Sequence, residues 1–108
     1  MQRPADADKK DTLYYLDRIC KSTAKYSTLN MYVRRDDVYK VDDEDFIKVL
    51  RRYMENGMSM RVVFGGLDKG DIREISSKFE SMGVEVGYKE SEMSPESYII
   101  NDVDLVTF

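Results

Sequence analysis

Histidine is absent from this chain of 108 residues, and its absence narrows the chemistry that the chain can perform. Histidine is the commonest general base and a frequent metal ligand, and the nucleophilic triads that rely on an imidazole require it. The sequence shows no other catalytic set. We therefore predict a protein that is not an enzyme and has no catalytic residues.

The densest acidic cluster, residues 42–45, is the one candidate for a metal site. It consists of Asp42, Asp43, Glu44 and Asp45. These residues open a predicted helix, however, and the helix dipole favours anions at that end. We interpret the cluster as a complement to the dipole, and we predict no metal and no other cofactor.

Cysteine is nearly absent, because Cys20 is the only one. An internal disulfide is excluded, and such low cysteine usage is typical of a reducing compartment. Cys20 falls on the apolar stripe of a predicted helix, so we assign it to packing. No apolar run is long enough to span a bilayer, and the start of the chain lacks the apolar core of a signal peptide. We predict a cytoplasmic protein without membrane insertion.

An excess of positive charge is also missing, since the net charge is -4 with acidic residues spread along the chain. General binding to nucleic acid is therefore not expected. A content of 42% hydrophobic and 35% charged residues is typical of a soluble globular protein, and the length suits one domain. We expect residues 1–10 to form a flexible lead-in or linker and residues 11–108 to form a single domain.

Three helices are predicted, over residues 11–26, 42–56 and 68–82, from apolar residues at helical spacing. Asp11 or Thr12 is a candidate N-cap for the first helix, and Asp68 or Asp71 for the third. The second helix is the clearest, because Asn56-Gly57 supplies a left-handed stop after it.

Strands are predicted over residues 28–33, 60–64 and 84–88, and a final pair over 98–100 and 103–108 is joined by a turn at Asn101-Asp102. The run 60–64 is continuously apolar apart from Arg61, as in a strand buried on both faces. Residues 34–37 and 89–97 are expected to be loops. The fold class is therefore α/β: a three-layer α/β/α sandwich with a mixed, mainly parallel sheet and a C-terminal β-hairpin.

A binding site is expected outside the carboxyl ends of the parallel strands, where open α/β sheets bind ligands. The turn at Gly65-Gly66 is expected to lead into the third helix, so that free backbone N–H groups and the helix dipole attract an anion. Arginine side chains add charge-assisted hydrogen bonds. The candidate ligand-binding residues are Arg34, Arg35, Gly65, Gly66, Lys69 and Lys89.

The ligand expected there is a phosphate, a carboxylate or a sugar derivative. The glycine patterns of dinucleotide-binding and P-loop proteins are both absent. The alternative therefore stays open that the two glycines only make a tight turn and that the arginines are solvated.

The segments 56–64 and 82–86, with the helices that precede and join them, resemble the phospholipase D superfamily. In that family a glycine-valine strand is followed by a motif of histidine, any residue, lysine, four residues and aspartate. Laid onto this chain, the motif positions fall on Pro95, Ser97 and Asp102, so the histidine and the lysine are missing. The resemblance covers roughly residues 11–108 and implies a degenerate, non-catalytic member. Such a member is similar to the regulatory, effector-binding parts of archaeal transcription regulators. The resemblance also implies a homodimer or a larger regulator.

Two functions follow as hypotheses. The first is a non-catalytic, phospholipase D-like regulatory domain that binds a small anionic or sugar-like ligand, mediates dimerisation, or does both. The second is a protein-interaction module that uses the edge of the C-terminal hairpin, whose apolar residues are Val103, Leu105, Val106 and Phe108.

Overall fold

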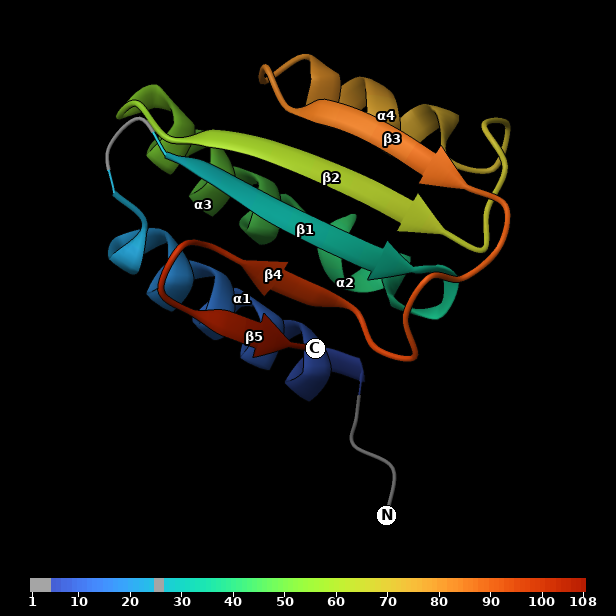
Figure 1. Cartoon of the computed structure of the whole chain (residues 1–108), viewed down its shortest axis with the longest axis horizontal. Coiled ribbons are helices and arrows are strands. Elements are labelled where there is room, and N and C mark those ends of the chain that lie inside the picture. Colours follow the sequence, from blue (N-terminus) through green and yellow to red (C-terminus); the bar gives the residue numbers. More distant parts are fainter. Residues whose placement is uncertain (1–4, 25–26) are drawn as a thin grey trace.

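Five strands form one mixed sheet in the order β3-β2-β1-β4-β5 in the computed structural model, which describes residues 5–24 and 27–108 (Figure 1). The strands are β1 (Thr28–Arg34), β2 (Ser59–Gly65), β3 (Glu85–Lys89), β4 (Tyr98–Ile100) and β5 (Leu105–Thr107). The helices are α1 (Ala5–Ser22), α2 (Val38–Val41), α3 (Glu44–Glu55) and α4 (Arg73–Glu80), with a short 3-10 helix η1 (Arg35–Asp37). The two longer pairings, β1 with β2 and β2 with β3, are parallel, and the C-terminal strands pair antiparallel.

The core lies on one face of the sheet. Leu29, Met31 and Val33 of β1 stand beside Met60, Val62 and Phe64 of β2 in register, and all six are buried. The helices cover this face with their own apolar stripes, which include Leu16, Ile19, Phe46, Leu50, Ile75 and Phe79. The α/β class, the mainly parallel mixed sheet and the C-terminal pair of strands are thus confirmed.

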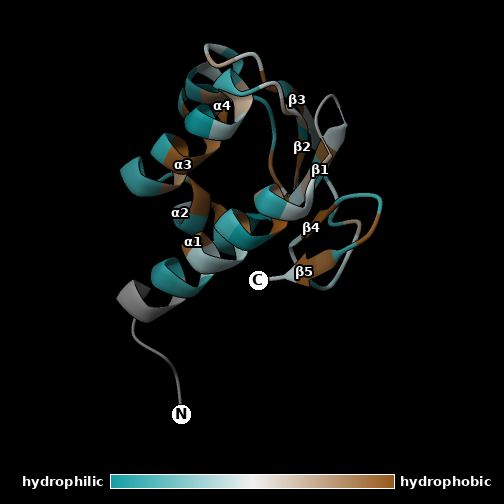
Figure 2. Cartoon of the chain, turned by 90° about the vertical axis from the view of Figure 1, so that its left-hand side faces the viewer, coloured by the Kyte–Doolittle hydropathy of each residue, from teal (hydrophilic) through white to brown (hydrophobic). Residues whose placement is uncertain are grey.

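The number of layers differs from the prediction. The helices that the structure describes all lie on the same side of the sheet, so the domain has two layers and the other face carries no helix (Figure 2). The reason is visible in β2, whose apolar run is interrupted by the exposed Arg61, while Val63 is only half-buried. The run therefore alternates, and it was wrong to interpret it as a strand buried on both faces.

Helix α3 matches the prediction most closely. The side chain of Asp43 accepts hydrogen bonds from the backbone N–H groups of Asp45 and Phe46, each at 3.2 Å, and so caps the helix. Gly57 follows the helix with φ 104°, in the left-handed region that favours glycine. The acidic cluster thus serves the start of a helix, as the sequence indicated.

The other helices have different bounds from those expected. Helix α1 already begins at Ala5, so residues 5–10 are helical rather than a flexible lead-in; residues 1–4 and 25–26 lie outside the described part. Residues 35–41, which follow β1, form η1 and α2 instead of a simple loop. Helix α4 is short, and Asp68 and Asp71 do not cap it, because each accepts a hydrogen bond from the other's backbone N–H.

A polar contact joins α1 to α3. Tyr53 Oη donates a hydrogen bond to Asp17 Oδ1 at 2.8 Å, and Lys21 pairs with the same carboxylate at 3.0 Å. The hydrogen bonds from Lys21 and Tyr53 lower the pKa of Asp17, whereas burial and the bond to Asp17 raise the pKa of Tyr53 to about 12. Burial also raises the pKa of the nearby Cys20 thiol to about 12, so Cys20 stays protonated near neutral pH and packs as an apolar group.

Candidate functional site

The carboxyl ends of the three parallel strands meet in one row across the sheet. Arg34 of β1 is the register partner of Gly65 in β2, and Gly65 is the partner of Lys89 in β3. Because core-facing residues alternate with these positions along each strand, Arg34, Gly65 and Lys89 lie on the face of the sheet that carries none of the described helices, which we call the helix-free face. The structure therefore brings three of the predicted residues side by side at the expected edge.

Gly66 and Arg35 lie next to this row. Gly66 has φ 80°, and a Cβ atom placed on it would lie 3.5 Å from the Cβ atom of Arg35 and 3.1 Å from Cγ of Glu92. We call the six residues Arg34, Arg35, Gly65, Gly66, Lys89 and Glu92 the strand-end site. The absence of a side chain at Gly66 is what lets Glu92 approach so closely.

The turn at Gly65-Gly66 does not supply free N–H groups, contrary to expectation. The N–H groups of Gly66 and Leu67 both donate to the carbonyl oxygen of Lys89, at 2.9 and 3.3 Å. The turn also does not open α4, which begins only at Arg73. Any anion at this edge therefore depends on side chains rather than on the turn or a helix dipole.

Glu92, which the sequence did not single out, places a carboxylate beside Arg34. The distance from Arg34 Nη2 to Glu92 Oε2 is 3.4 Å, which is long for a charge-assisted hydrogen bond. Arg34 Nε is buried and has no acceptor within the described residues. The guanidinium thus lies next to one carboxylate and still has an unused donor.

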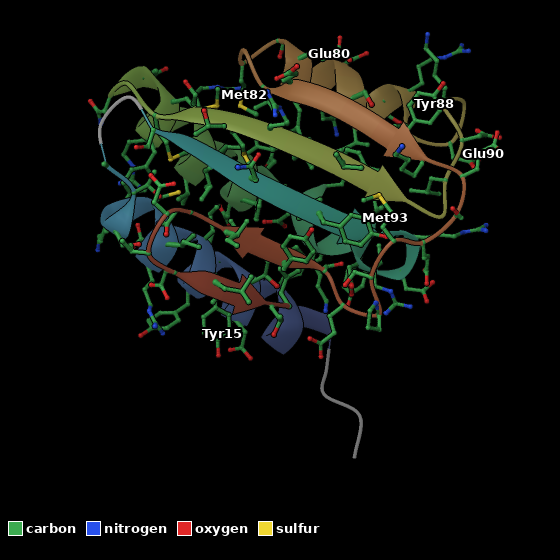
Figure 3. The ribbon with its side chains drawn as sticks, in the orientation of Figure 1. Tyr15, Glu80, Met82, Tyr88, Glu90 and Met93 are labelled. Atoms are coloured by element: carbon green, nitrogen blue, oxygen red, sulfur yellow. The ribbon has the colours of Figure 1, made fainter. Side chains whose placement is uncertain are left out.

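Tyr32 fixes the loop that carries Glu92. Its hydroxyl oxygen accepts a hydrogen bond from the backbone N–H of Met93 at 2.7 Å, and Figure 3 shows Met93 over the helix-free face of the sheet. A Cβ atom at Gly65 would lie 2.0 Å from Tyr32 Oη, so the glycine is needed to make room for the tyrosine. Tyr32 and Gly65 together hold the 89–97 loop against the strand-end site.

A buried polar network supports the end of β1. Ser97 Oγ donates to Asp37 Oδ2 at 2.6 Å and accepts the backbone N–H of Arg34 at 2.8 Å, while Lys40 Nζ pairs with Asp37 Oδ1 at 3.0 Å. Ser97 is fully buried. Nothing in the local sequence around Asp37 indicates this network, since its members meet only through the tertiary fold.

The three positions of the degenerate family motif are not brought together. Pro95 and Ser97 precede β4, next to the carboxyl end of β1, whereas Asp102 lies in the turn after the other end of β4. Asp102 is exposed, and the preceding Asn101 shapes the turn by accepting the N–H groups of Val103 and Asp104. Ser97 acts here as a structural hydrogen-bonding residue.

Lys69, the sixth predicted ligand-binding residue, lies elsewhere. It lines a groove of about 400 Å³ between α4 and β3, on the helix side of the sheet, with Ile72, Arg73, Ser76, Ser77, Glu80, Val86 and Tyr88. We call this the α4–β3 groove. Lys69 therefore lines a groove on the helix side of the sheet, whereas Arg34, Gly65 and Lys89 lie on the opposite face.

The C-terminal hairpin lies at the opposite edge of the sheet from β3. Val103 and Leu105 are 78% and 57% exposed, whereas Val106 and Phe108 pack against the core. Only half of the apolar residues that the sequence assigned to an exposed edge are thus available to a partner.

These features define a two-layer α/β domain with a basic cluster at the ends of its parallel strands. In the ranges 5–24 and 27–108, no helix is long and apolar enough to cross a membrane, and no three acidic or cysteine side chains gather as metal ligands. Comparison with protein-family models, curated proteins and solved structures found no match to this chain.

Proposed function

We propose that this chain is a non-catalytic regulatory domain that binds a small anionic ligand at the strand-end site. The observation that carries the proposal is Arg34, whose guanidinium keeps a buried Nε without an acceptor and meets Glu92 only at 3.4 Å. A buried donor that is left unpaired is costly, so an oxyanion that reached it would gain a charge-assisted hydrogen bond.

Glu92 supports the same proposal, because a carboxylate already occupies part of the space beside Arg34 and Gly66. A phosphate or carboxylate of a ligand would displace Glu92 and pair with Arg34, with Arg35 and Lys89 nearby. The Arg34–Glu92 pair contributes little stability, because its contact is long at 3.4 Å and the side chain of Glu92 is 40% exposed to solvent that screens it. Its displacement therefore costs the fold little.

The assignment as non-catalytic rests on the residues at the motif positions. The phospholipase D superfamily, which this chain resembles, uses a histidine nucleophile and a phosphate-holding lysine at the positions where this chain has Pro95 and Ser97. Proline has no nucleophilic group, and the hydroxyl of Ser97 is enclosed by Asp37 and the N–H of Arg34. Neither residue can perform the chemistry of the family.

The test is binding of inorganic phosphate, followed by calorimetry and by the rise in melting temperature that native-state binding produces. Arg34→Gln should weaken phosphate binding about tenfold, the size expected for one charge-assisted hydrogen bond. Glu92→Gln should tighten it, because the competing carboxylate is removed.

Arg61→Gln is the matched control. Arg61 of β2 lies on the same face of the sheet as Arg34, but it pairs with Glu85 at 2.8 Å, away from the carboxyl ends of the strands. Its phosphate affinity should equal that of the wild type. Equal loss in Arg61→Gln and Arg34→Gln would show that only net charge matters, and no saturable binding to the wild type would exclude the site.

A second candidate function is a protein-interaction module that uses the edge at β5, favoured by the exposed Val103 and Leu105. The N–H of Phe108 bonds to the carbonyl of Ser97, so by strand alternation the N–H of Thr107 points away from β4. Thr107→Pro should therefore abolish pairing along β5 while the hairpin stays intact. If two copies of this chain pair along β5, sedimentation velocity should show that Thr107→Pro removes their self-association, and self-association that survives the substitution excludes β5 as the pairing edge.

A further inference from the structure

Strand β3 is the other free edge of the sheet, and it is bordered by the α4–β3 groove. Figure 3 shows Glu80 on α4 and Tyr88 on β3, toward opposite ends of this edge. The groove is lined by the apolar residues Ile72 and Val86, by Tyr88, and by charged residues that include Arg73 and Glu80. An apolar strip beside unpaired backbone groups is suited to a further strand.

The backbone groups that β3 offers can be identified. The carbonyl of Lys89 accepts hydrogen bonds from Gly66 and Leu67, so Lys89 faces β2. By alternation along the strand, Glu85 and Gly87 also face β2, and the N–H and C=O groups of Val86 and Tyr88 point outward. Their side chains point to the helix side, because they are register partners of the core residues Val62 and Phe64.

The sequence of β3 complements itself when it is paired antiparallel about Gly87. Val86 then stands opposite Tyr88 of the second copy, and these pairs exchange both backbone hydrogen bonds. Glu85 stands opposite Lys89 of the second copy, so that opposite charges meet on the helix-free face. Gly87, at the axis, adds no side chain between the two strands.

Helix α4 repeats this complementarity on the other face. Arg73 and Glu80 line the groove at opposite ends of α4, with the small Ser76 and Ser77 between them. A two-fold axis at Gly87 would place Arg73 beside Glu80 of the second copy, twice. Within the part of the chain that the structure describes, neither Arg73 nor Glu80 has a salt-bridge partner of its own.

We infer that two copies of this chain pair antiparallel along β3 about a two-fold axis at Gly87, joining their sheets into one. Such an interface is isologous, so each complementary contact occurs twice. Of the two free edges, β5 has no charged residue and spans only Leu105–Thr107, whereas β3 carries a charge at each end. This interface shares Lys89 with the strand-end site, but its test changes only residues of α4 and leaves Arg34, Lys89 and Glu92 in place.

The experiment is sedimentation velocity of the full chain over a concentration series, with two charge reversals on α4. Arg73→Glu and Glu80→Arg should each weaken self-association about tenfold, because both contacts become repulsive. An equimolar mixture of the two variants should restore it, since Glu at 73 then meets Arg at 80 and Glu80 meets Arg73. A merely destabilised fold would not be rescued by mixing, and the melting temperature of each variant checks the fold.

Thr107→Pro is the control at the other edge, and its dimer should be unchanged. The inference is overturned if the wild type is monomeric at every concentration, or if mixing the two reversed variants restores nothing. It is overturned as well if Thr107→Pro, rather than the α4 variants, removes the dimer. Phosphate binding plays no part in these outcomes, so the two proposals fail separately.

Discussion

Replacing Phe79 with alanine should lower the free energy of unfolding by about 3–5 kcal/mol, as truncation of a buried aromatic does. Phe79 is fully buried, and its ring stacks 6.5 Å from that of Phe46 and lies 6.2 Å from that of Phe64. It therefore joins α4 to both α3 and β2. Its loss opens a cavity where three elements meet and removes the main anchor of a short helix.

Urea denaturation followed by circular dichroism measures this loss. Phe79→Leu keeps most of the apolar volume and should cost clearly less than the alanine variant. Tyr14→Ala is the control, because Tyr14 is exposed on α1, and it should change stability by less than about 0.5 kcal/mol. If Phe79→Ala costs no more than Tyr14→Ala, the packing described around this ring is wrong.

Elements with a clear period could be predicted from the sequence. Strand β1 alternates Leu29, Met31 and Val33 with Asn30 and Tyr32, and helix α3 has an acidic start and a glycine after its end; both formed as expected. Whether helices cover both faces could not be predicted in the same way. The number of helix layers depends on Arg61, the one exposed charge inside the apolar run of β2. The surroundings of Arg61 depend in turn on which strands pair with β2.

The strand-end site was predictable in part for a simple geometric reason. Carboxyl ends of parallel strands meet at one edge, so Arg34, Gly65 and Lys89 had to fall in a row once the pairing was right. Glu92 and Ser97 could not be placed, because their contacts with Arg34 span 58 and 63 residues of chain. Lys69 was misplaced since α4 starts later than its sequence pattern indicated.

Replacing Asp37 with alanine should lower the free energy of unfolding by about 2–4 kcal/mol. This loss is smaller than the cost of breaking a deeply buried ion pair, because the ammonium group of Lys40 can still reach water. The side chains of Asp37 and Lys40 are 12% and 15% exposed, and their atoms Oδ1 and Nζ are 3.0 Å apart. The substitution leaves the ammonium without its carboxylate and the hydroxyl of Ser97 without its acceptor. Asp36→Ala, at the exposed neighbouring position, is the matched control and should stay within about 0.5 kcal/mol of the wild type.

A double-mutant cycle separates the two losses. Lys40→Met alone removes the charge partner, and if the ion pair dominates, Asp37→Ala combined with Lys40→Met should cost less than the sum of the two single changes. If the hydrogen bond to Ser97 dominates, the two losses should add. If the losses add, the position of Arg34 in the strand-end site should also be disturbed, because Ser97 accepts the hydrogen bond from the backbone N–H of Arg34. Phosphate affinity of Asp37→Ala should then fall together with stability, although Asp37 itself does not contact the anion.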